Sequence, residues 1–197
     1  MTGTTGYGIE LDGSPVMGYE DAPVDMYYWS DYMCPWCKTF ALEIHPKIAK
    51  NEVANGDLRV VFLELPYKTK HSWPAAVLAK CVWREVSKTD PDLYWKWHHS
   101  VFAAIKEHGT EWANLEQLFK ITESVGIDTK PLATCIETRQ KQIKKDIQAE
   151  IEAANRTGIK GTPAFLLYNR ETGTKSKVKG AQPYPRFSSK IQSVKNS

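Results

Sequence analysis

The chain has 197 residues, enough for one domain with a substantial core, with or without an insertion. Apolar residues make up 42% and charged residues 25%, and a net charge of +3 is too small to indicate nucleic acid or an anionic membrane as a partner. No apolar run approaches the roughly 18 residues that would span a bilayer. The N-terminus lacks the basic and apolar regions of a signal peptide, which leaves two alternatives: a cytoplasmic protein, or a mature chain whose leader was removed.

The first part of the chain alternates between strand and helix patterns. Residues 1–15 are rich in glycine and predict an irregular arm with room for one short strand. Residues 24–30 are β-branched and aromatic in type and predict a strand, and helical apolar spacing over residues 35–50 predicts a helix directly after it. Residues 58–65 predict a second, more fully buried strand, which Pro66 ends.

The pattern is then helical from residue 72 to residue 157. Pro74 opens the first predicted helix, and the others cover residues 93–107, 115–125 and 140–157. Strand patterns return after this block, and the chain ends in a short helix; these elements are expected at residues 164–168, 177–179 and 185–194.

This order predicts an α/β fold with an inserted all-helical domain. The two strand groups must pair into one sheet, because neither is stable as an isolated fragment. We therefore expect an N-terminal arm (1–15), an α/β domain made of two segments (16–71 and 158–197), and a helical insertion (72–157).

A pair of cysteines lies where the first strand runs into the first helix, in the run Cys34-Pro35-Trp36-Cys37. A thiol at a helix N-terminus has a lowered pKa because unpaired N–H groups and the helix dipole stabilise the thiolate. Pro35 suits the first helical turn, and Cys37 follows Cys34 on the same helical face, where it can close a disulfide. The pattern predicts a redox-active pair with an exposed Cys34 as the attacked sulfur and Cys37 as the resolving thiol.

A CxxC pair can also be half of a metal site or a static bridge. A second close cysteine pair is absent, which argues against a four-cysteine zinc site, and the histidines show no metal-binding spacing. We therefore predict no metal.

Four further segments are distinctive: residues 15–24 (PVMGYEDAPV), 30–37 (SDYMCPWC), 158–165 (GIKGTPAF) and 180–183 (GAQP). In this order they resemble the DsbA-like family of thioredoxin-fold proteins, over about residues 15–194. The resemblance implies a thiol–disulfide oxidoreductase whose Thr162-Pro163 turn is a cis-proline loop beside the active disulfide. A turn of this kind leaves the Thr162 backbone free to pair with an extended substrate peptide. The alternative is an ordinary trans proline at a strand start.

The chain departs from the family six residues before Cys34, where many relatives carry a buried acidic residue and this chain has Tyr28. A tyrosine, with a pKa of about 10, does not readily take a proton from Cys37, and a reductase needs that proton removed. The departure favours an oxidase, although Glu64 or Asp31 remains an alternative proton acceptor. Trp36 either offers an apolar face to an unfolded substrate or packs against the cis-proline loop.

The remaining cysteines, Cys81 and Cys135, both fall in the helical block. Relatives often carry cysteines at both places, so the resemblance implies a structural disulfide there. The alternative is two buried free cysteines that act as small apolar residues. A persistent bridge requires an oxidising compartment.

The resulting hypothesis is a DsbA-like dithiol oxidase that acts on cysteine-containing protein substrates. It needs no cofactor beyond the Cys34–Cys37 disulfide, and family analogy implies a membrane redox partner. We expect a monomer in an extracytoplasmic compartment (periplasmic, cell-surface or secreted), with a cytoplasmic location as the alternative. The rival functions are a disulfide reductase or isomerase of the same fold, and a soft-metal-binding CxxC module.

Overall fold

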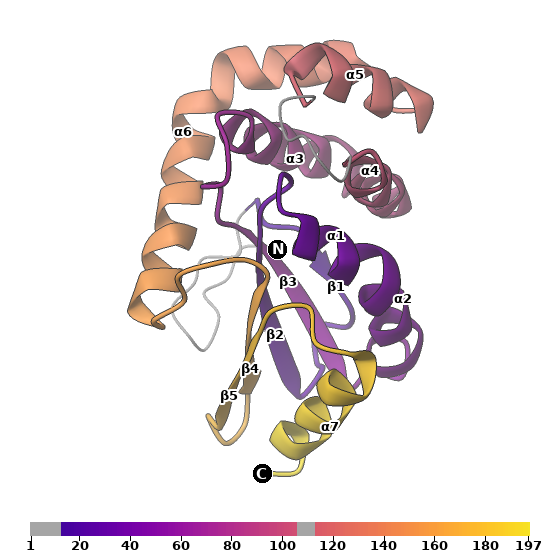
Figure 1. The fold of residues 1–197 in the computed structure, drawn as a ribbon. Coiled ribbons are helices and arrows are strands. Elements are labelled where there is room, and N and C mark those ends of the chain that lie inside the picture. The colour runs from indigo at the N-terminus through magenta and orange to yellow at the C-terminus, as the bar shows by residue number, and fades with distance from the viewer. Residues whose placement is uncertain (1–12, 106–112) are drawn as a thin grey trace.

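The structure is a computed structural model that describes residues 13–105 and 113–197, so most of the expected arm lies outside the described residues. Its described strands form one mixed sheet in the order β1-β3-β2-β4-β5 (Figure 1). Strands β2 (Val24–Ser30) and β3 (Leu58–Glu64) pair in parallel. The antiparallel strands are β1 (Val16–Met17), β4 (Ala164–Asn169) and β5 (Lys175–Lys179). The predicted α/β class is confirmed.

Alternating side chains of β2 supply the cores on both faces of the sheet. Met26 and Tyr28 pack with the helices on one face, and Tyr27 and Trp29 pack with a helix on the other. Figure 1 shows the first side covered by α1 (Pro35–Thr39), α2 (His45–Ile48) and α7 (Tyr184–Lys195). The second side is covered by α6 (Thr129–Arg156). All seven residues of β2 are buried, the polar Asp25 and Ser30 among them, as expected for a strand covered on both faces. All seven residues of β3 are buried as well, so the expectation that the second strand is the more fully buried of the two was wrong.

A helical run follows β2 and connects it to β3. It consists of α1 (Pro35–Thr39), η1 (Phe40–Ile44), α2 (His45–Ile48) and η2 (Ala49–Val53), where η marks π-helical turns. Pro46 lies within this run, where it removes one N–H from the helical ladder. The π-turn η1 ends just before it, which is a common way for a helix to absorb such an interruption.

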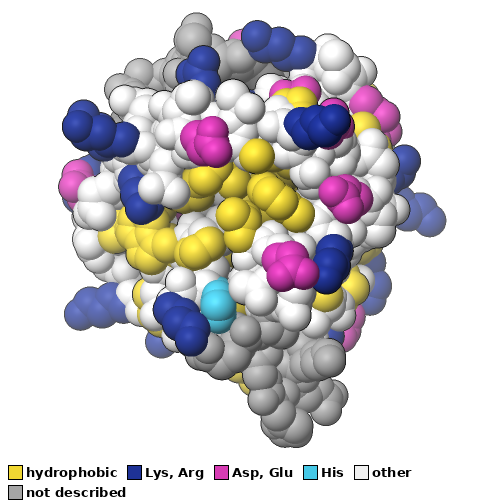
Figure 2. All heavy atoms as spheres, turned by 90° about the horizontal axis from the view of Figure 1, so that it is seen from above, with side chains coloured by type: hydrophobic (Ala, Val, Ile, Leu, Met, Phe, Trp, Pro, Cys, Tyr) yellow, Lys and Arg dark blue, Asp and Glu magenta, His cyan; other side chains and the backbone are white. Residues whose placement is uncertain are grey.

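The insertion between β3 and β4 contributes four described helices. They are α3 (Ser72–Val86), α4 (Pro91–Ala103), α5 (Leu115–Ser124) and α6 (Thr129–Arg156). In Figure 1, α3, α4 and α5 lie above one end of the sheet, and α6 runs down beside it. Figure 2 views that end from above and shows apolar side chains at its centre, surrounded by charged ones.

The prediction for the last of these helices was wrong at its start, since α6 begins at Thr129 and not at residue 140. Asp128 caps it by accepting a hydrogen bond from the Lys130 N–H (2.9 Å). Pro131 stands in the first turn, where a proline is tolerated, and Leu132 is the one fully buried side chain of the early turns. With so few buried residues, the early turns carry little helical periodicity.

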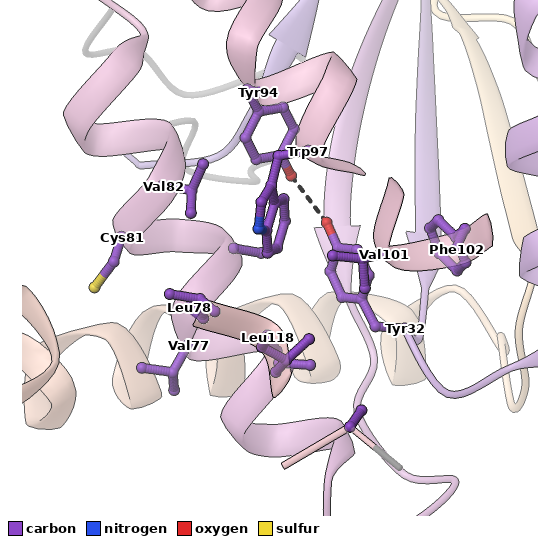
Figure 3. Packing of buried hydrophobic residues seen from close by; sticks show 14 of the residues in the cluster. Tyr32, Val77, Leu78, Cys81, Val82, Tyr94, Trp97, Val101, Phe102 and Leu118 are labelled. Atoms are coloured by element: carbon purple, nitrogen blue, oxygen red, sulfur yellow. Dashed lines mark hydrogen bonds between the residues drawn. The ribbon is translucent and has the colours of Figure 1, made fainter. Parts of the chain in front are cut away.

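The insertion has its own apolar core, which extends to the loop after β2. Figure 3 shows Tyr32 from that loop packed among Trp97, Val101 and Phe102 of α4. The Tyr32 and Phe102 rings stack with centroids 5.0 Å apart. The loop that leads into the redox helix is therefore part of the insertion core.

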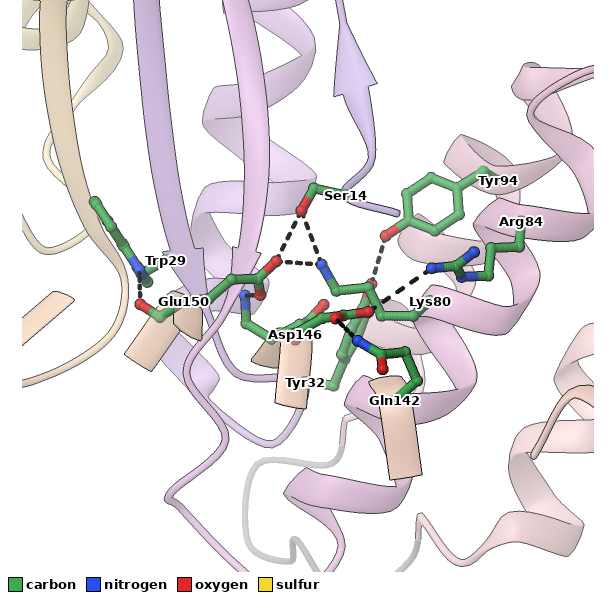
Figure 4. Close-up of polar contacts among 10 residues, drawn as sticks. Ser14, Trp29, Tyr32, Lys80, Arg84, Tyr94, Gln142, Asp146 and Glu150 are labelled. Atoms are coloured by element: carbon green, nitrogen blue, oxygen red, sulfur yellow. Dashed lines mark hydrogen bonds and ion pairs between the residues drawn. The ribbon is translucent and has the colours of Figure 1, made fainter. Parts of the chain in front are cut away.

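A buried carboxylate, Glu150 of α6, joins the insertion to the sheet (Figure 4). Its oxygens accept hydrogen bonds from Ser14 Oγ (2.7 Å) and from the Glu64 backbone N–H (2.7 Å), and it forms a salt bridge with Lys80 of α3. Its backbone carbonyl accepts the Trp29 indole N–H (3.0 Å). Because each partner is buried, loss of the Glu150 carboxylate would leave the Lys80 ammonium without this counter-charge and the Glu64 N–H without its acceptor.

A disulfide joins Cys81 of α3 to Cys135 of α6, with a sequence separation of 54. The bridge connects the two helices of the insertion that also share the Lys80–Glu150 salt bridge. Among the described residues, none of the helices has the length and apolar character that a membrane crossing requires.

We predict that the double variant Cys81→Ala, Cys135→Ala is less stable by up to about 4 kcal/mol, because its unfolded chain regains the entropy of a loop of this size. Denaturant unfolding of the oxidised proteins would measure the difference. Thiol exchange at Cys34 and Cys37 should be unchanged in the variant. Mass mapping that finds two alkylatable thiols at positions 81 and 135 in protein kept without reductant would contradict the bridge.

Candidate redox site

The Cys34–Cys37 pair lies at the point where β2 gives way to α1. Cys34 is the N-cap residue of α1, and Pro35 is in its first turn. The Cys34 N–H donates to the Asp31 carbonyl (2.9 Å), while the Cys34 carbonyl accepts the N–H groups of Cys37 (3.0 Å) and Lys38 (3.1 Å). Neither cysteine is bridged in this structure, so it represents the dithiol form.

The expectation that Cys34 is exposed was wrong, because its exposed fraction is 0%. Its thiol lies against the loop before β4 and donates to the Thr162 carbonyl oxygen (3.4 Å). The Thr162–Pro163 peptide bond is cis. Trp36, in contrast, is 66% exposed, so the indole lies on the surface next to the covered sulfur.

The pKa of the Cys34 thiol is lowered from 9.0 to about 6. The largest cause is a hydrogen bond from the Cys37 thiol, and burial opposes it. The Thr162 side chain, the Cys37 backbone N–H and the charge of Lys68 lower the pKa further. The Thr162 hydroxyl is buried and has no hydrogen-bond partner among the described residues, which leaves it available to a Cys34 thiolate. Cys34 is therefore the thiol that carries negative charge near neutral pH.

Cys37 has the opposite character. Burial raises its pKa well above 9.0, and the neighbouring Cys34 raises it further. Tyr28 is fully buried near Cys37. Burial, and to a smaller extent the charge of Cys37, raises the pKa of the Tyr28 phenol well above 10. Tyr28 therefore cannot serve as a base for the Cys37 proton.

Asp31 and Glu64, the two alternative acceptors for the Cys37 proton, lie in different environments. The Asp31 carboxylate accepts three backbone N–H groups, from Met33 (2.8 Å), Tyr67 (2.8 Å) and Lys68 (2.9 Å). Glu64 is buried, and burial raises the pKa of its carboxyl well above 4.5. Asp31 thus works as an anchor for two loops, a role that its position in the sequence does not indicate.

Tyr67 and Lys68 belong to this site and were missed from the sequence. They lie in the loop between β3 and α3, and the Tyr67 hydroxyl accepts the Thr162 N–H (3.3 Å). The sequence did carry a signal for both residues: they follow the carboxyl end of β3, which is parallel to β2. Functional loops of α/β sheets gather at that end of the strands.

The structure thus brings together Cys34, Cys37, Tyr28 and the Thr162–Pro163 turn, with Trp36 at the surface. The Cys81–Cys135 disulfide lies apart from them, between α3 and α6. In the part of the chain that the structure describes, no group of three or more His, Cys, Asp or Glu side chains is arranged to hold a metal ion.

Comparisons with known proteins agree with this geometry. The family model described as Thioredoxin matches residues 10–184. "Disulfide bond formation protein D" of Bacillus subtilis (strain 168) is 31% identical over 163 residues, which cover 81% of this chain and 70% of that protein. "Probable disulfide bond formation protein D" of Bacillus anthracis is 23% identical over 77% of this chain and 68% of that protein.

A solved structure of oxidised BdbD from Bacillus subtilis aligns with a TM-score of 0.80 and 25% identity, covering 100% of this chain and 98% of that chain. DsbA of Chlamydia trachomatis aligns with a TM-score of 0.74 and 24% identity, over 92% of this chain and 91% of that chain. These matches confirm the predicted thioredoxin fold with its mostly helical insertion.

We predict that Cys34 titrates with a midpoint near pH 6. The ultraviolet absorbance of its thiolate measures this titration. A folded-state pKa below the unfolded value stabilises the reduced protein above the unfolded pKa, and this stabilisation is lost as the pH falls through the folded pKa. The free energy of unfolding of the reduced form, relative to the oxidised form, should therefore rise between about pH 6 and the ordinary thiol value of 9.0.

The variant Cys34→Ser is the control for both measurements. It should remove the titration near pH 6, and its free energy of unfolding should show the same pH dependence as that of the oxidised unaltered protein, because Cys37 keeps its proton through this range. A thiolate midpoint near 9.0 in the unaltered protein would contradict the assignment of Cys34 as the stabilised thiolate.

Proposed function

Because this chain belongs to the thioredoxin family and, within it, to the DsbA-like thiol–disulfide oxidoreductases, we propose that it is a dithiol oxidase that introduces disulfides into cysteine-containing proteins. The observation that carries the direction is the opposite shift of the two thiols. The pKa of Cys34 is lowered to about 6, and burial raises the pKa of Cys37. A stabilised Cys34 thiolate favours the dithiol form of the enzyme, which makes its disulfide a good oxidant.

The proposed reaction begins with attack of a substrate thiolate on Cys34 of the Cys34–Cys37 disulfide. A substrate–Cys34 bond forms, and Cys37 leaves as a thiolate that takes up a proton, as its raised pKa favours. A second substrate thiolate then attacks the substrate sulfur of the mixed disulfide, and Cys34 leaves as a thiolate. Two electrons pass from the substrate dithiol to the enzyme. The low pKa of Cys34, the leaving group, speeds the attack of the second substrate thiolate.

The Thr162–Pro163 turn is the proposed docking site for the substrate backbone. Its main chain lies directly over Cys34, so a peptide paired with Thr162 would hold its cysteine next to the reactive sulfur. Trp36, exposed beside it, offers apolar surface to an unfolded segment.

The reductase alternative is less well supported. A reductase must deprotonate Cys37 in the step that acts on its substrate, whereas an oxidase needs this only when it is itself reoxidised; here burial raises the pKa of Cys37 and of the adjacent Tyr28. No observation favours an isomerase or a soft-metal module over the oxidase. We propose that the Cys34–Cys37 couple works without an organic cofactor or metal.

The compartment and the partners follow from the same chemistry. A dithiol oxidase and a persistent Cys81–Cys135 bridge both suit an oxidising compartment, which supports an extracytoplasmic location. A cycle of oxidations also needs an electron acceptor for the reduced enzyme, and we propose a membrane redox partner by family analogy. The monomeric state stays a prediction.

We predict opposite outcomes for the two single cysteine variants. Cys37→Ser should accumulate a mixed disulfide with a substrate protein, because Cys34 remains available for exchange while the resolving thiol is gone. Cys34→Ser should form no such adduct and should lose exchange activity with its fold intact. Non-reducing gels measure the adducts, and the absence of adducts from Cys37→Ser would reject Cys37 as the resolving thiol.

The direction of electron flow is tested by the reduction potential of the couple in a glutathione series. We predict a potential well above roughly −270 mV, the value for thioredoxin, because the dithiol form is stabilised by the Cys34 thiolate. The variant Cys81→Ala, Cys135→Ala should have the same potential. A value near that of thioredoxin would assign the chain to the reductases.

A further inference from the structure

Both main-chain groups of Thr162 are occupied by side chains in this dithiol structure. The Thr162 N–H donates to the Tyr67 hydroxyl (3.3 Å), and the Thr162 carbonyl accepts the Cys34 thiol (3.4 Å). These are the two groups that an added peptide strand would use for backbone hydrogen bonds. Each is therefore held by a group that stands where a peptide carbonyl or N–H would be.

The Cys34 contact disappears as the site becomes ready for substrate. Neither a Cys34 thiolate nor a Cys34–Cys37 disulfide has an S–H to donate, so the Thr162 carbonyl is left open in both states. The hydrogen bond from the Thr162 N–H to Tyr67 is not lost in the same way, because the Tyr67 hydroxyl remains an acceptor in either redox form. Tyr67 must therefore move before a peptide carbonyl can reach the Thr162 N–H.

The position of Tyr67 allows this movement. Tyr67 is 48% exposed, whereas its backbone N–H is fixed by the buried Asp31 carboxylate (2.8 Å). The backbone is thus anchored while the ring can turn toward solvent. The N···O distance of 3.3 Å lies just beyond the usual range for an N–H···O hydrogen bond, so this contact is weak and little is lost when it breaks.

Lys68 adds charge to the same edge of the site. Its backbone N–H is held by Asp31 (2.9 Å), and its ammonium lies 4.8 Å from the centre of the Tyr67 ring. The charge of Lys68 also contributes to the lowered pKa of Cys34, which places the ammonium within electrostatic reach of the reactive sulfur. The pKa of the Lys68 ammonium is raised, first by a hydrogen bond to the Tyr67 side chain and then by the nearby charges of Cys34 and Asp31.

We propose that Tyr67 and Lys68 form a substrate-recognition edge: the Tyr67 hydroxyl caps the docking N–H of Thr162 until a peptide carbonyl displaces it, and Lys68 selects segments that carry a carboxylate beside the reactive cysteine. The proposal rests on the oxidase function above and names its substrate class. Tyr67 and Lys68 are recognition residues, and neither takes part in the exchange of sulfur atoms.

The role of Tyr67 is tested with Tyr67→Phe, which removes the hydroxyl and keeps the ring. Oxidation of a short cysteine peptide should show a KM lower by about two- to fivefold with little change in kcat, because the peptide no longer competes with the hydroxyl. Oxidation of 2-mercaptoethanol, which has no backbone to pair with Thr162, should be unchanged. An unchanged or higher KM for the peptide would overturn the capping role.

The role of Lys68 is tested with two peptides that differ only in a glutamate or a glutamine next to the cysteine. The unaltered enzyme should prefer the glutamate peptide by about two- to fivefold in kcat/KM at low salt, in line with an exposed ion pair. Lys68→Gln should abolish this preference, and Lys68→Glu should reverse it. Because the ratio is taken within one enzyme at one pH, any change in Cys34 reactivity cancels.

Lys70→Gln is the matched control, since it removes the same charge two residues along the same loop. It should keep the preference of the unaltered enzyme. Equal rates for the two peptides in the unaltered enzyme, or a preference that survives in Lys68→Gln, would overturn the selective role of Lys68. Failure to oxidise both the peptides and 2-mercaptoethanol would instead reject the oxidase function itself.

Discussion

The geometry of the redox site depends on the hydrogen bonds that the buried Asp31 carboxylate accepts. It accepts backbone N–H groups from Met33, directly before the redox pair, and from Tyr67 and Lys68 in the loop after β3. Charge-assisted hydrogen bonds of this kind are among the stronger polar contacts in a protein. One side chain therefore fixes the start of the redox helix and the loop that faces the cis-proline turn, so that the reactive thiol and its surroundings form one unit.

The insertion is held against that unit by buried polar contacts as well as by apolar packing. The Glu150 carboxylate pairs with Lys80 and accepts the Glu64 N–H, which ties α3 and α6 to the end of strand β3. Such a network brings little net stability relative to apolar packing, but a misplaced insertion would leave its charges unpaired. The network thus favours one placement of the helices over the redox site, and the Cys81–Cys135 bridge reinforces it covalently.

The sequence predicted the central strands and the redox pair well, because these depend on local patterns. Residues 24–30 were expected as a strand and are β2 with the same bounds. The start of α6 was missed because its early turns bury few side chains and so carry little periodicity. Tyr67, Lys68 and the anchoring role of Asp31 were missed for another reason: they act through contacts between segments far apart in the sequence, and the burial of Cys34 under the Thr162 carbonyl is of the same kind.

The contrast between the two thiols has a consequence for the second half of the proposed cycle. To be reoxidised, the Cys34 thiolate must attack the disulfide of its partner, and Cys37 must then lose its proton to displace that partner. Burial raises the pKa of Cys37, and it raises the pKa of the adjacent Tyr28 as well, so neither group promotes this step. In an oxidase of this design, substrate oxidation ends with the proton on Cys37 where burial favours it. Removal of that proton is then the demanding step of reoxidation. Burial stabilises the protonated Cys37 thiol that substrate oxidation produces, and the same burial opposes the loss of its proton when the enzyme is reoxidised.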